Sequence, residues 1–542
     1  MGTSEAPATP SLALWLPTTL LLCSSCWAGQ LQGVIVDSRD GSPIAARLYI
    51  EDGRGESFFA QSAHPAGSAV TYSKRRSADS VEIHTTLSAH PFLAELPHGS
   101  YTITAERGKE YLPSTREVLV EEGSTEIKIE LRRWVRMAEH GWYSGETHVH
   151  RSMDELPNLL MAEDLNVALP LTYWVTAAGT PPGQGDKNSP PAQPRVLEVD
   201  PLHVIYPMNT EYEIFTVGGE RHTLGAVFAL NHRSVLDRGA PPVAPIADQV
   251  HGEGGLLELD KHNWPWSMML VPVMDVDLYE LTNNHIWQAP FYFREFGEEP
   301  ADYMNVDRTD NGLTEEGWID FTFQNYYLLL NCGFRLRPTA GTASGVHPVP
   351  LGFGRVYVHL GAKFSYDGWI EGLNDGRSFV TTGPMLDVRV NGRLSGRPFQ
   401  QRQGEDGTYR LSGWIRSARP LARIEVVAAG SVIHRFTPEN RIDSAGGYLN
   451  AIEQQFSFGS STWLAVRCYE RTEEGRLRFA HSAPFHIDVA GMPLRPGREE
   501  VDYLLSRVQS ELERHRGVLP ESAIAEYEHA LEVYRNLEVA PQ

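Results

Sequence analysis

The order of strand-like and helical segments constrains this chain more than any other feature. Between about Trp134 and Pro384, the apolar runs VALPLTYWV, HTLGAVFAL, GGLLEL and VDLYEL alternate with helical stretches, and the clearest helix is predicted over Glu315 to Cys332. Strands that alternate with helices favour a parallel β/α architecture. We therefore expect residues 134–384 to form a β/α barrel.

Strand patterns without helices lie on both sides of this block. Residues 30–133 (GVIVDS, SYTITAER, EIKIEL) and residues 385–490 (LDVRVNG, ARIEVVAAG, PFHIDV) each predict an antiparallel β-sandwich. The first resembles transthyretin-like or carboxypeptidase-regulatory-like sandwiches. Residues 498–540 predict two amphipathic helices that form a hairpin. The expected fold class is therefore multidomain α/β plus β, with one barrel, two flanking sandwiches and a C-terminal helical hairpin.

The N-terminus has the character of an export signal. Leu12 to Ala28 is an apolar stretch, interrupted by proline, that ends in small residues, so we expect a signal peptide over residues 1–28 and a periplasmic or extracellular protein. Two features depart from the usual pattern, since no Lys or Arg precedes the apolar run and Glu5 is acidic. Cys26 leaves lipid anchoring as a less favoured alternative. No other apolar run reaches membrane-spanning length, so no transmembrane span is expected.

Charge and cysteine content exclude several classes of function. The chain has 47 Lys and Arg against 69 Asp and Glu, a net charge of −22, and we expect no nucleic-acid partner because phosphate binding needs clustered cations. Beyond the signal segment only Cys332 and Cys468 remain, too few for a disulfide framework or a cysteine-based zinc cluster. A small-molecule or glycan-like substrate is the expected partner.

Histidines near strand ends are the strongest functional pattern. His148 and His150 are two residues apart in GWYSGETHVH, so on a strand both imidazoles face the same side and can bind one metal ion. Strand ends form the active-site face of β/α barrels, and a metal ion there activates water for hydrolysis. The other candidates at or near strand ends are Glu211, Glu213, His222, His262 and His347.

At these residues the chain resembles the PHP-type metallohydrolases, and among them the CehA/McbA-like branch. The resemblance covers about residues 135–385 and implies a distorted, TIM-related barrel that binds divalent metals and hydrolyses phosphoester, carbamate or other ester bonds. The segments that carry it are GWYSGETHVH (141–150), EIFT with RHTLGAVF (213–228), GGLLELDKHNW (254–264), NCGFRLRPTAGTASG (331–345) and SFVTTGP (378–384).

The resemblance also implies roles for single residues. His148 and His150 match the paired first-strand ligands, and Glu213 matches the metal-bridging glutamate, with Glu211 the less favoured choice. His222 and His262 match later histidines of the family. The resemblance thus implies metal ligands at His148, His150, Glu213, His222 and His262, to which His347 is added, and catalytic roles for Glu213, His222 and His262.

Two departures from the family reduce the expected number of metal ions. The family has aspartates at positions that are Tyr173 and Ala343 in this chain. Fewer anionic ligands offset less cationic charge, so we expect one or two ions, with zinc favoured over manganese or iron. The residues considered as replacements for the missing carboxylates are Glu146, Asp260 and His347.

Two functions therefore remain open at the level of the sequence. The favoured one is an exported metal-dependent hydrolase of ester, carbamate or phosphoester bonds. The alternative is a catalytically degenerate barrel that acts as a secreted carbohydrate-binding, surface-binding or scaffold protein. Aromatic residues near the candidate site, which can stack on sugars or close the core, bear on that alternative. They are Tyr173, Trp174, Trp264, Trp266 and Trp287.

Overall fold

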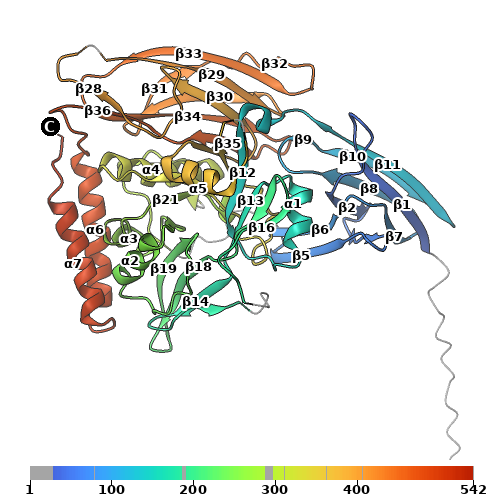
Figure 1. The fold of residues 1–542 in the computed structure, drawn as a ribbon, viewed down its shortest axis with the longest axis horizontal. Helices are drawn as coiled ribbons and strands as arrows, with labels where there is room; N and C mark the ends of the chain where they lie inside the picture. The colour runs from blue at the N-terminus through green and yellow to red at the C-terminus, as the bar shows by residue number, and fades with distance from the viewer. Residues whose placement is uncertain are drawn as a thin grey trace, which may run out of the picture.

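The computed structural model describes residues 28–540 apart from 79, 186–190, 287–296, 311, 362 and 406. Strands predominate over helices in these residues and form several sheets. Figure 1 shows one sandwich on the right, a second sandwich at the top, a helical hairpin on the left and the mixed central block between them. The predicted signal segment lies almost wholly outside the described residues, as does Trp287.

The N-terminal block consists of two facing sheets, as the alternating pattern predicts, but it is not wholly antiparallel, because β1 pairs with β11 in parallel. One sheet has the order β4-β7-β1-β11-β9 and the other β10-β8-β2-β6-β5, with β3 paired to β2. Their inner faces share a core that includes Leu31, Ile50 and Phe92. The strands are β1 (Ala28–Asp37), β2 (Ala46–Asp52), β3 (Ser57–Phe58), β4 (Gln61–Ser62), β5 (Ala69–Ser77), β6 (Ser80–Leu87), β7 (Phe92–Pro97), β8 (Gly99–Glu106), β9 (Tyr111–Leu112), β10 (Ser114–Val120) and β11 (Ser124–Arg133).

The central block contains parallel strand pairs, as expected, but most of its strands fall into two sheets. A separate two-stranded sheet is formed by β22 (Arg308–Thr309) and β23 (Gly312–Leu313). One sheet has the order β15-β14-β18-β19-β20-β21-β24. The described strands form no closed barrel, so the barrel remains a prediction. The bounds are β14 (Tyr173–Ala177), β15 (Gly183–Gln184), β18 (Thr210–Val217), β19 (Glu220–Leu230), β20 (Leu256–Leu259), β21 (Leu278–Thr282) and β24 (Arg337–Ala340).

The remaining central strands, among them β16 (Leu197–Asp200) and β17 (His203–Ile205), belong to a longer sheet that continues into the second sandwich. β12 (Trp142–Val149) pairs in parallel with β13 (Val167–Pro170) and antiparallel to β25 (Arg355–His359). β26 (Ser378–Thr381) then pairs with β35 (Leu477–Ser482), so the predicted boundary near residue 384 is crossed by continuous hydrogen bonding. The predicted run VALPLTYWV is divided between β13 and β14, which lie in different sheets.

The C-terminal sandwich is formed by the end of this long sheet and a smaller one of order β27-β29-β33-β32. A core that includes Leu386, Val426 and Phe485 lies between them. The strands are β27 (Met385–Val390), β28 (Phe399–Gln401), β29 (Thr408–Ser417), β30 (Leu421–Ala428), β31 (Ser431–Phe436), β32 (Arg441–Ile442), β33 (Tyr448–Ser457), β34 (Thr462–Arg471) and β36 (Phe485–Val489).

Helices cover the central sheets. The predicted helix at Glu315 forms as α4, whose first turn is capped by the Thr314 hydroxyl, which accepts the Gly317 N–H at 3.0 Å. The expected C-terminal hairpin also forms, and Glu526 on it accepts N–H groups from Val243 and Ala244 at the start of α2. The helices are α1 (Leu156–Glu163), α2 (Ala244–Gly252), α3 (Ser267–Met274), α4 (Glu315–Asn331), α5 (Tyr366–Asp375), α6 (Arg498–His515) and α7 (Glu521–Arg535).

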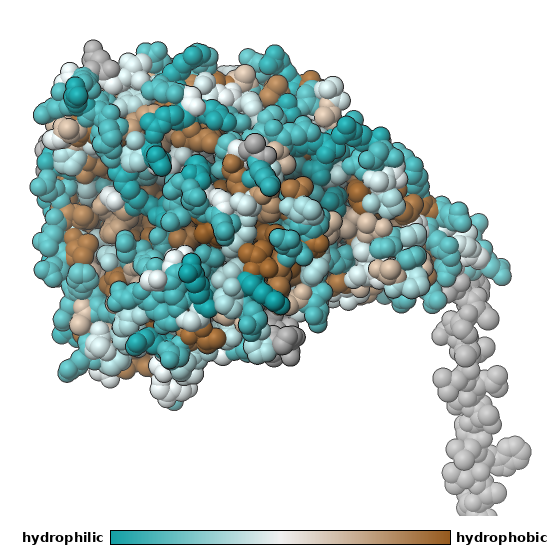
Figure 2. All heavy atoms as spheres, in the orientation of Figure 1, coloured by the Kyte–Doolittle hydropathy of each residue, from teal (hydrophilic) through white to brown (hydrophobic). Residues whose placement is uncertain are grey.

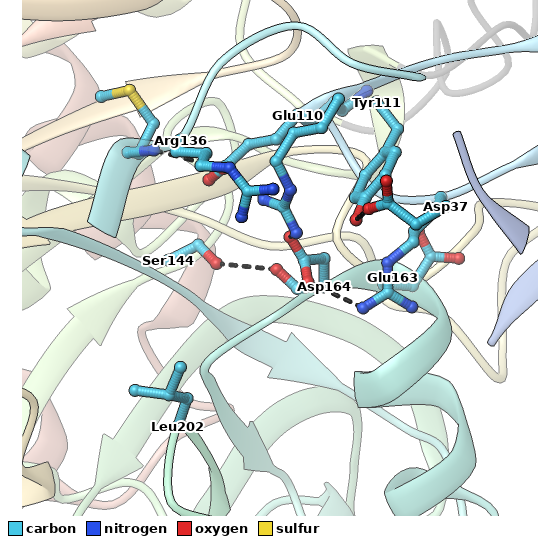
Figure 3. Close-up of polar contacts among 12 residues, drawn as sticks. Asp37, Glu110, Tyr111, Arg136, Ser144, Glu163, Asp164 and Leu202 are labelled. Atoms are coloured by element: carbon cyan, nitrogen blue, oxygen red, sulfur yellow. Dashed lines mark hydrogen bonds and ion pairs between the residues drawn. The ribbon is translucent and has the colours of Figure 1, made fainter. Parts of the chain in front are cut away.

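Buried ion pairs fix the N-terminal sandwich to the central block. Asp164, just after α1, pairs with Arg107 at 2.8 Å and with Arg133 at 2.7 Å, and Arg133 also pairs with Glu110 at 2.7 Å. Figure 3 shows Glu110 and Tyr111 of the sandwich beside Asp164. Largely buried pairs of this kind are costly to break, so the sandwich is held in one position against the central block.

One face of the molecule is mainly polar. The face in Figure 2 is mostly hydrophilic, with smaller apolar areas between the polar side chains. Among the helices of the described residues, none is both long and apolar enough to cross a membrane.

Candidate metal site

The paired histidines stand at the end of a fully buried strand. β12 is buried along its whole length, and His148 lies on it while His150 follows its last residue. The strand alternation turns Val149 toward a hydrophobic cluster on one side and both imidazoles toward a pocket on the other. The ring centroids are 5.2 Å apart.

Glu211 completes a group of three metal-ligating side chains. It lies on β18, and its Oε2 is 3.3 Å from His150 Nε2. Ligand atoms from His148, His150 and Glu211 all lie within 4.8 Å of one another. Ligands about 2.0 Å from a tetrahedral zinc ion are about 3.3 Å apart, so the spacing fits one such ion.

A second carboxylate orients His148. Glu280 Oε1, on β21, lies 2.9 Å from His148 Nδ1, which leaves Nε2 as the ligand nitrogen. A metal-binding histidine usually donates its other N–H to a carboxylate in this way. Gly341 permits the contact, since a Cβ atom there would lie 2.1 Å from His148 Cβ and 2.2 Å from Glu280 Oε1.

A lysine compensates the remaining carboxylates. His148, Asp260 and Glu280 form a second group of donors within 4.8 Å, but the Lys261 ammonium pairs directly with Asp260. Burial opposes ionisation of Asp260, yet Lys261 holds its pKa below the usual range. Burial and the Asp260 charge raise the pKa of Glu280 well above normal. The buried Asp260–Lys261 pair is electrically neutral, so Asp260 does not need a metal ion to compensate its charge.

The pocket in front of these residues has a volume of about 330 Å³. Burial lowers the pKa of His148 and of His347 well below the ordinary value and that of His285 to about 3, so all three are neutral at pH 7. Neutral imidazoles are the form that binds metals. The lining includes Arg76, His148, His150, Trp174, Glu211, Glu213, Arg221, Lys261, Trp264, His285, Ala343 and His347.

Glu213, the favoured bridging residue, lines the pocket but is in neither group of metal-ligating side chains. Burial raises its pKa to about 8, although the Lys261 charge works against the shift. The structure therefore places Glu211, the less favoured choice, with the two histidines, and leaves Glu213 as a carboxyl that can hold a proton near neutral pH.

Two of the predicted histidines face away from the pocket. Arg221 and Thr223 line it, whereas His222 between them points to the other side of β19 and lies 2.9 Å from His515 Nδ1 on α6. Both ring nitrogens of His262 make hydrogen bonds to α4. Nε2 lies 3.0 Å from the Thr322 hydroxyl, and Nδ1 lies 2.8 Å from the Asn325 amide nitrogen. This corrects the expected ligand set, because strand alternation and these contacts keep His222 and His262 from the site.

The positions of the missing aspartates differ in their surroundings. Ala343 lines the pocket, whereas Tyr173 belongs to the hydrophobic core. Of the three residues considered as replacements, only His347 lines the pocket. Asp260 pairs with Lys261, and Glu146 accepts the Thr342 N–H at 2.8 Å.

The aromatic residues divide in the same way. Trp174 and Trp264 line the pocket, although Trp264 is only 4% exposed. Trp266 is fully buried and packs on Gly225. Two of the predicted aromatic residues therefore line the pocket, and the others that the structure describes, Tyr173 and Trp266, belong to the core.

One pocket histidine was not predicted. His285 lies in a short 3-10 turn directly after β21. Its position follows the run VDLYELT, so the argument that placed candidates at strand ends applies to His285 as well.

Comparisons with protein-family models, curated proteins and solved structures gave no match to this chain.

Proposed function

We propose that this protein is a metal-dependent hydrolase of ester, carbamate or phosphoester bonds, built on a PHP-like barrel and exported from the cell. The observation that carries the proposal is the convergence of His148, His150 and Glu211 on one side of an enclosed pocket. Two imidazoles and one carboxylate are a common set of ligands for catalytic zinc, which leaves one position open.

We assign one divalent ion to this group, with zinc favoured over manganese or iron. When bound, such an ion supplies a Lewis acid that activates water and polarises the substrate. Glu280 holds the His148 ring in place through the 2.9 Å contact to Nδ1. Glu213 lies in the same pocket with a pKa near 8, so its carboxyl is suited to take up or deliver a proton at neutral pH.

The alternative is a binding protein on a degenerate barrel, and one observation favours it. Trp174 and Trp264 line the same pocket as the metal-ligating residues, and aromatic walls also suit a bound sugar or flat ligand. The two functions differ in whether the metal ion is needed for turnover.

Metal analysis of matched histidine variants tests the proposal. Wild type is expected to bind one zinc per chain and to hydrolyse chromogenic esters or phosphoesters, and His150→Gln is expected to lose both. His222→Gln is the control, because His222 faces α6 and not the pocket. Circular dichroism and thermal unfolding check that both variants fold. A wild type that takes up no stoichiometric metal, or equal hydrolysis by wild type and His150→Gln, would refute the hydrolase.

A further inference from the structure

Segments from outside the central block bind the backbone around the pocket. From the N-terminal sandwich, the Tyr72 hydroxyl on β5 accepts the Gly345 N–H at 2.9 Å and donates to the His347 carbonyl, so β5 is tied to the loop that contains His347. From the C-terminal hairpin, Arg507 and Arg514 on α6 donate to backbone carbonyls of residues that line the pocket. Both ends of the chain therefore contact the backbone that carries pocket side chains.

Arg507 is a buried cation that binds carbonyl groups instead of a carboxylate. Its residue is 2% exposed, its Nη1 donates to the His262 carbonyl at 3.1 Å, and its Nη2 donates to the Trp264 carbonyl at 2.8 Å. In the part of the chain that the structure describes, no carboxylate forms an ion pair with this guanidinium. Burial of a charge without an opposite charge is costly, so the two carbonyl contacts are the interactions that hold this arginine in place.

The segment that Arg507 binds carries two side chains of the pocket. This segment, residues 260–266, follows β20, and its Lys261 and Trp264 line the pocket. The Trp264 ring lies near the Phe215 ring, with centroids 5.8 Å apart, and Phe215 also lines the pocket. The Trp264 carbonyl is bound by α6 while its indole lines the pocket, so a shift of the backbone at this residue moves the indole.

Arg514 makes a similar contact to β19. Its Nη2 donates to the carbonyl of Thr223, which lines the pocket, at 2.7 Å. The next carbonyl of the strand, that of Leu224, accepts the Trp266 N–H at 3.0 Å, so β19 and the segment of Trp264 are joined directly. The two arginines of α6 therefore act on one connected part of the pocket.

Other contacts anchor the hairpin, so its position does not depend on Arg507 alone. The Tyr534 hydroxyl on α7 donates to the Met268 carbonyl at 2.6 Å, and α6 packs in the core of the central block through Leu504 and Val508. Removal of the Arg507 guanidinium is therefore expected to leave the hairpin docked and to release the two carbonyls that it binds.

We infer that Arg507 is a positioning residue for the pocket: it holds Trp264 where the indole contacts the substrate, and Arg514 supports the neighbouring strand at Thr223. The role of the indole in substrate binding rests on the proposed hydrolase function, whereas the effect of Arg507 on Trp264 does not. The C-terminal hairpin thus supports the binding site, although none of its described residues lines the pocket.

Steady-state hydrolysis of 4-nitrophenyl butyrate by the zinc-loaded protein tests the effect on substrate binding. We expect Arg507→Met to raise KM about tenfold with little change in kcat, the pattern of weakened substrate binding. Zinc content should stay at the wild-type level, because the carbonyls that Arg507 binds do not belong to the metal-ligating residues. Arg498→Met, at an exposed arginine of the same helix, is the control and should keep the wild-type KM.

A double variant tests whether Arg507 acts through Trp264. Trp264→Ala should raise KM at least as much as Arg507→Met, and Arg507→Met combined with Trp264→Ala should be no worse than Trp264→Ala alone, because the two changes remove one coupled interaction. Effects on KM that multiply in the double variant would overturn the inference.

Fluorine NMR of protein labelled with 5-fluorotryptophan separates this inference from the proposed function. The Trp264 resonance is identified by its absence from Trp264→Phe. Arg507→Met should shift or broaden that resonance and Arg498→Met should not, whether or not any ester is cleaved. Arg507→Lys, which keeps the charge but loses the second donor direction, should also shift it and replaces Arg507→Met if that variant fails to fold. A Trp264 resonance at the wild-type position in the Arg507 variants would overturn the inference, whereas failure of wild type to cleave esters contradicts only the proposed function.

Discussion

Replacing Lys261 with methionine tests whether its ammonium stands where a second metal ion would otherwise bind. The side chains of Asp260 and Lys261 are 0% and 5% exposed, and their pairing compensates the carboxylate. Asp260 also belongs, with His148 and Glu280, to the second group of metal-ligating side chains. Lys261→Met therefore removes the resident cation and leaves its anionic surroundings intact.

The expected cost follows from the burial of the pair. Removal of one partner of a buried ion pair destabilises a protein by about 3 to 5 kcal/mol, because the remaining charge is uncompensated. Without metal, the free energy of unfolding of Lys261→Met should fall by that amount. A second ion present at roughly a hundred times its Kd would restore about 2.7 kcal/mol.

Two measurements check this prediction. Metal analysis after dialysis against zinc should give two ions per chain for Lys261→Met and one for wild type. Urea unfolding with and without a chelator should show a larger metal-dependent stabilisation in the variant. The double variant Lys261→Met with Asp260→Asn has no uncompensated charge and should return to one ion. Lys109→Met, at a partly buried lysine that lies over the Phe353 ring, is a control for the loss of a lysine side chain away from the pocket.

If Lys261→Met binds only one zinc ion, the Lys261 ammonium does not occupy the position of a second metal ion. If the variant is as stable as wild type in the presence of chelator, the buried Asp260 charge does not need Lys261 for compensation. That result would refute the electrostatic explanation of this cluster.

Four further variants test other parts of the structure. Gly341→Ala should displace His148 and reduce zinc affinity about 10-fold to 100-fold, measured by competition with a chelating dye. His262→Gln should keep the wild-type zinc content but lose about 1 to 3 kcal/mol of stability, because its buried hydrogen bonds to α4 are disturbed. Glu526→Ala should cost about 1 to 2 kcal/mol, since α2 loses the carboxylate that accepts its first N–H groups. Arg133→Met should cost about 3 kcal/mol or more through the loss of two largely buried ion pairs. The last three losses are measured by urea unfolding, and equal stability of variant and wild type would contradict the corresponding contact.

Local periodicity was sufficient to predict much of the architecture. The alternating runs predicted both flanking sandwiches, and the helix at Glu315 begins at the predicted residue. Local patterns do not show whether the central strands close into a barrel, because closure depends on which strands pair. The run from Val167 to Val175 appears continuous in the sequence, yet it supplies strands to two different sheets.

In the candidate site, residue spacing within one strand was predictable, whereas contacts between distant segments were not. The spacing of His148 and His150 predicts their common face. Glu211 and Glu213 also share a face of β18, so the sequence cannot decide between them, and the 3.3 Å contact to His150 is a matter of how distant segments pack. His222 faces away because strand alternation gives the pocket to Arg221 and Thr223.

The contact of Tyr72 with the loop at His347 bears on how this protein can be divided for study. One hydroxyl serves as donor to one backbone group of that loop and acceptor from another. A fragment that begins at residue 134 would lose both these hydrogen bonds and Arg76, which lines the pocket. The central block therefore cannot be studied as a fragment on its own. Any fragment that is meant to keep the pocket intact must include the β5–β6 hairpin.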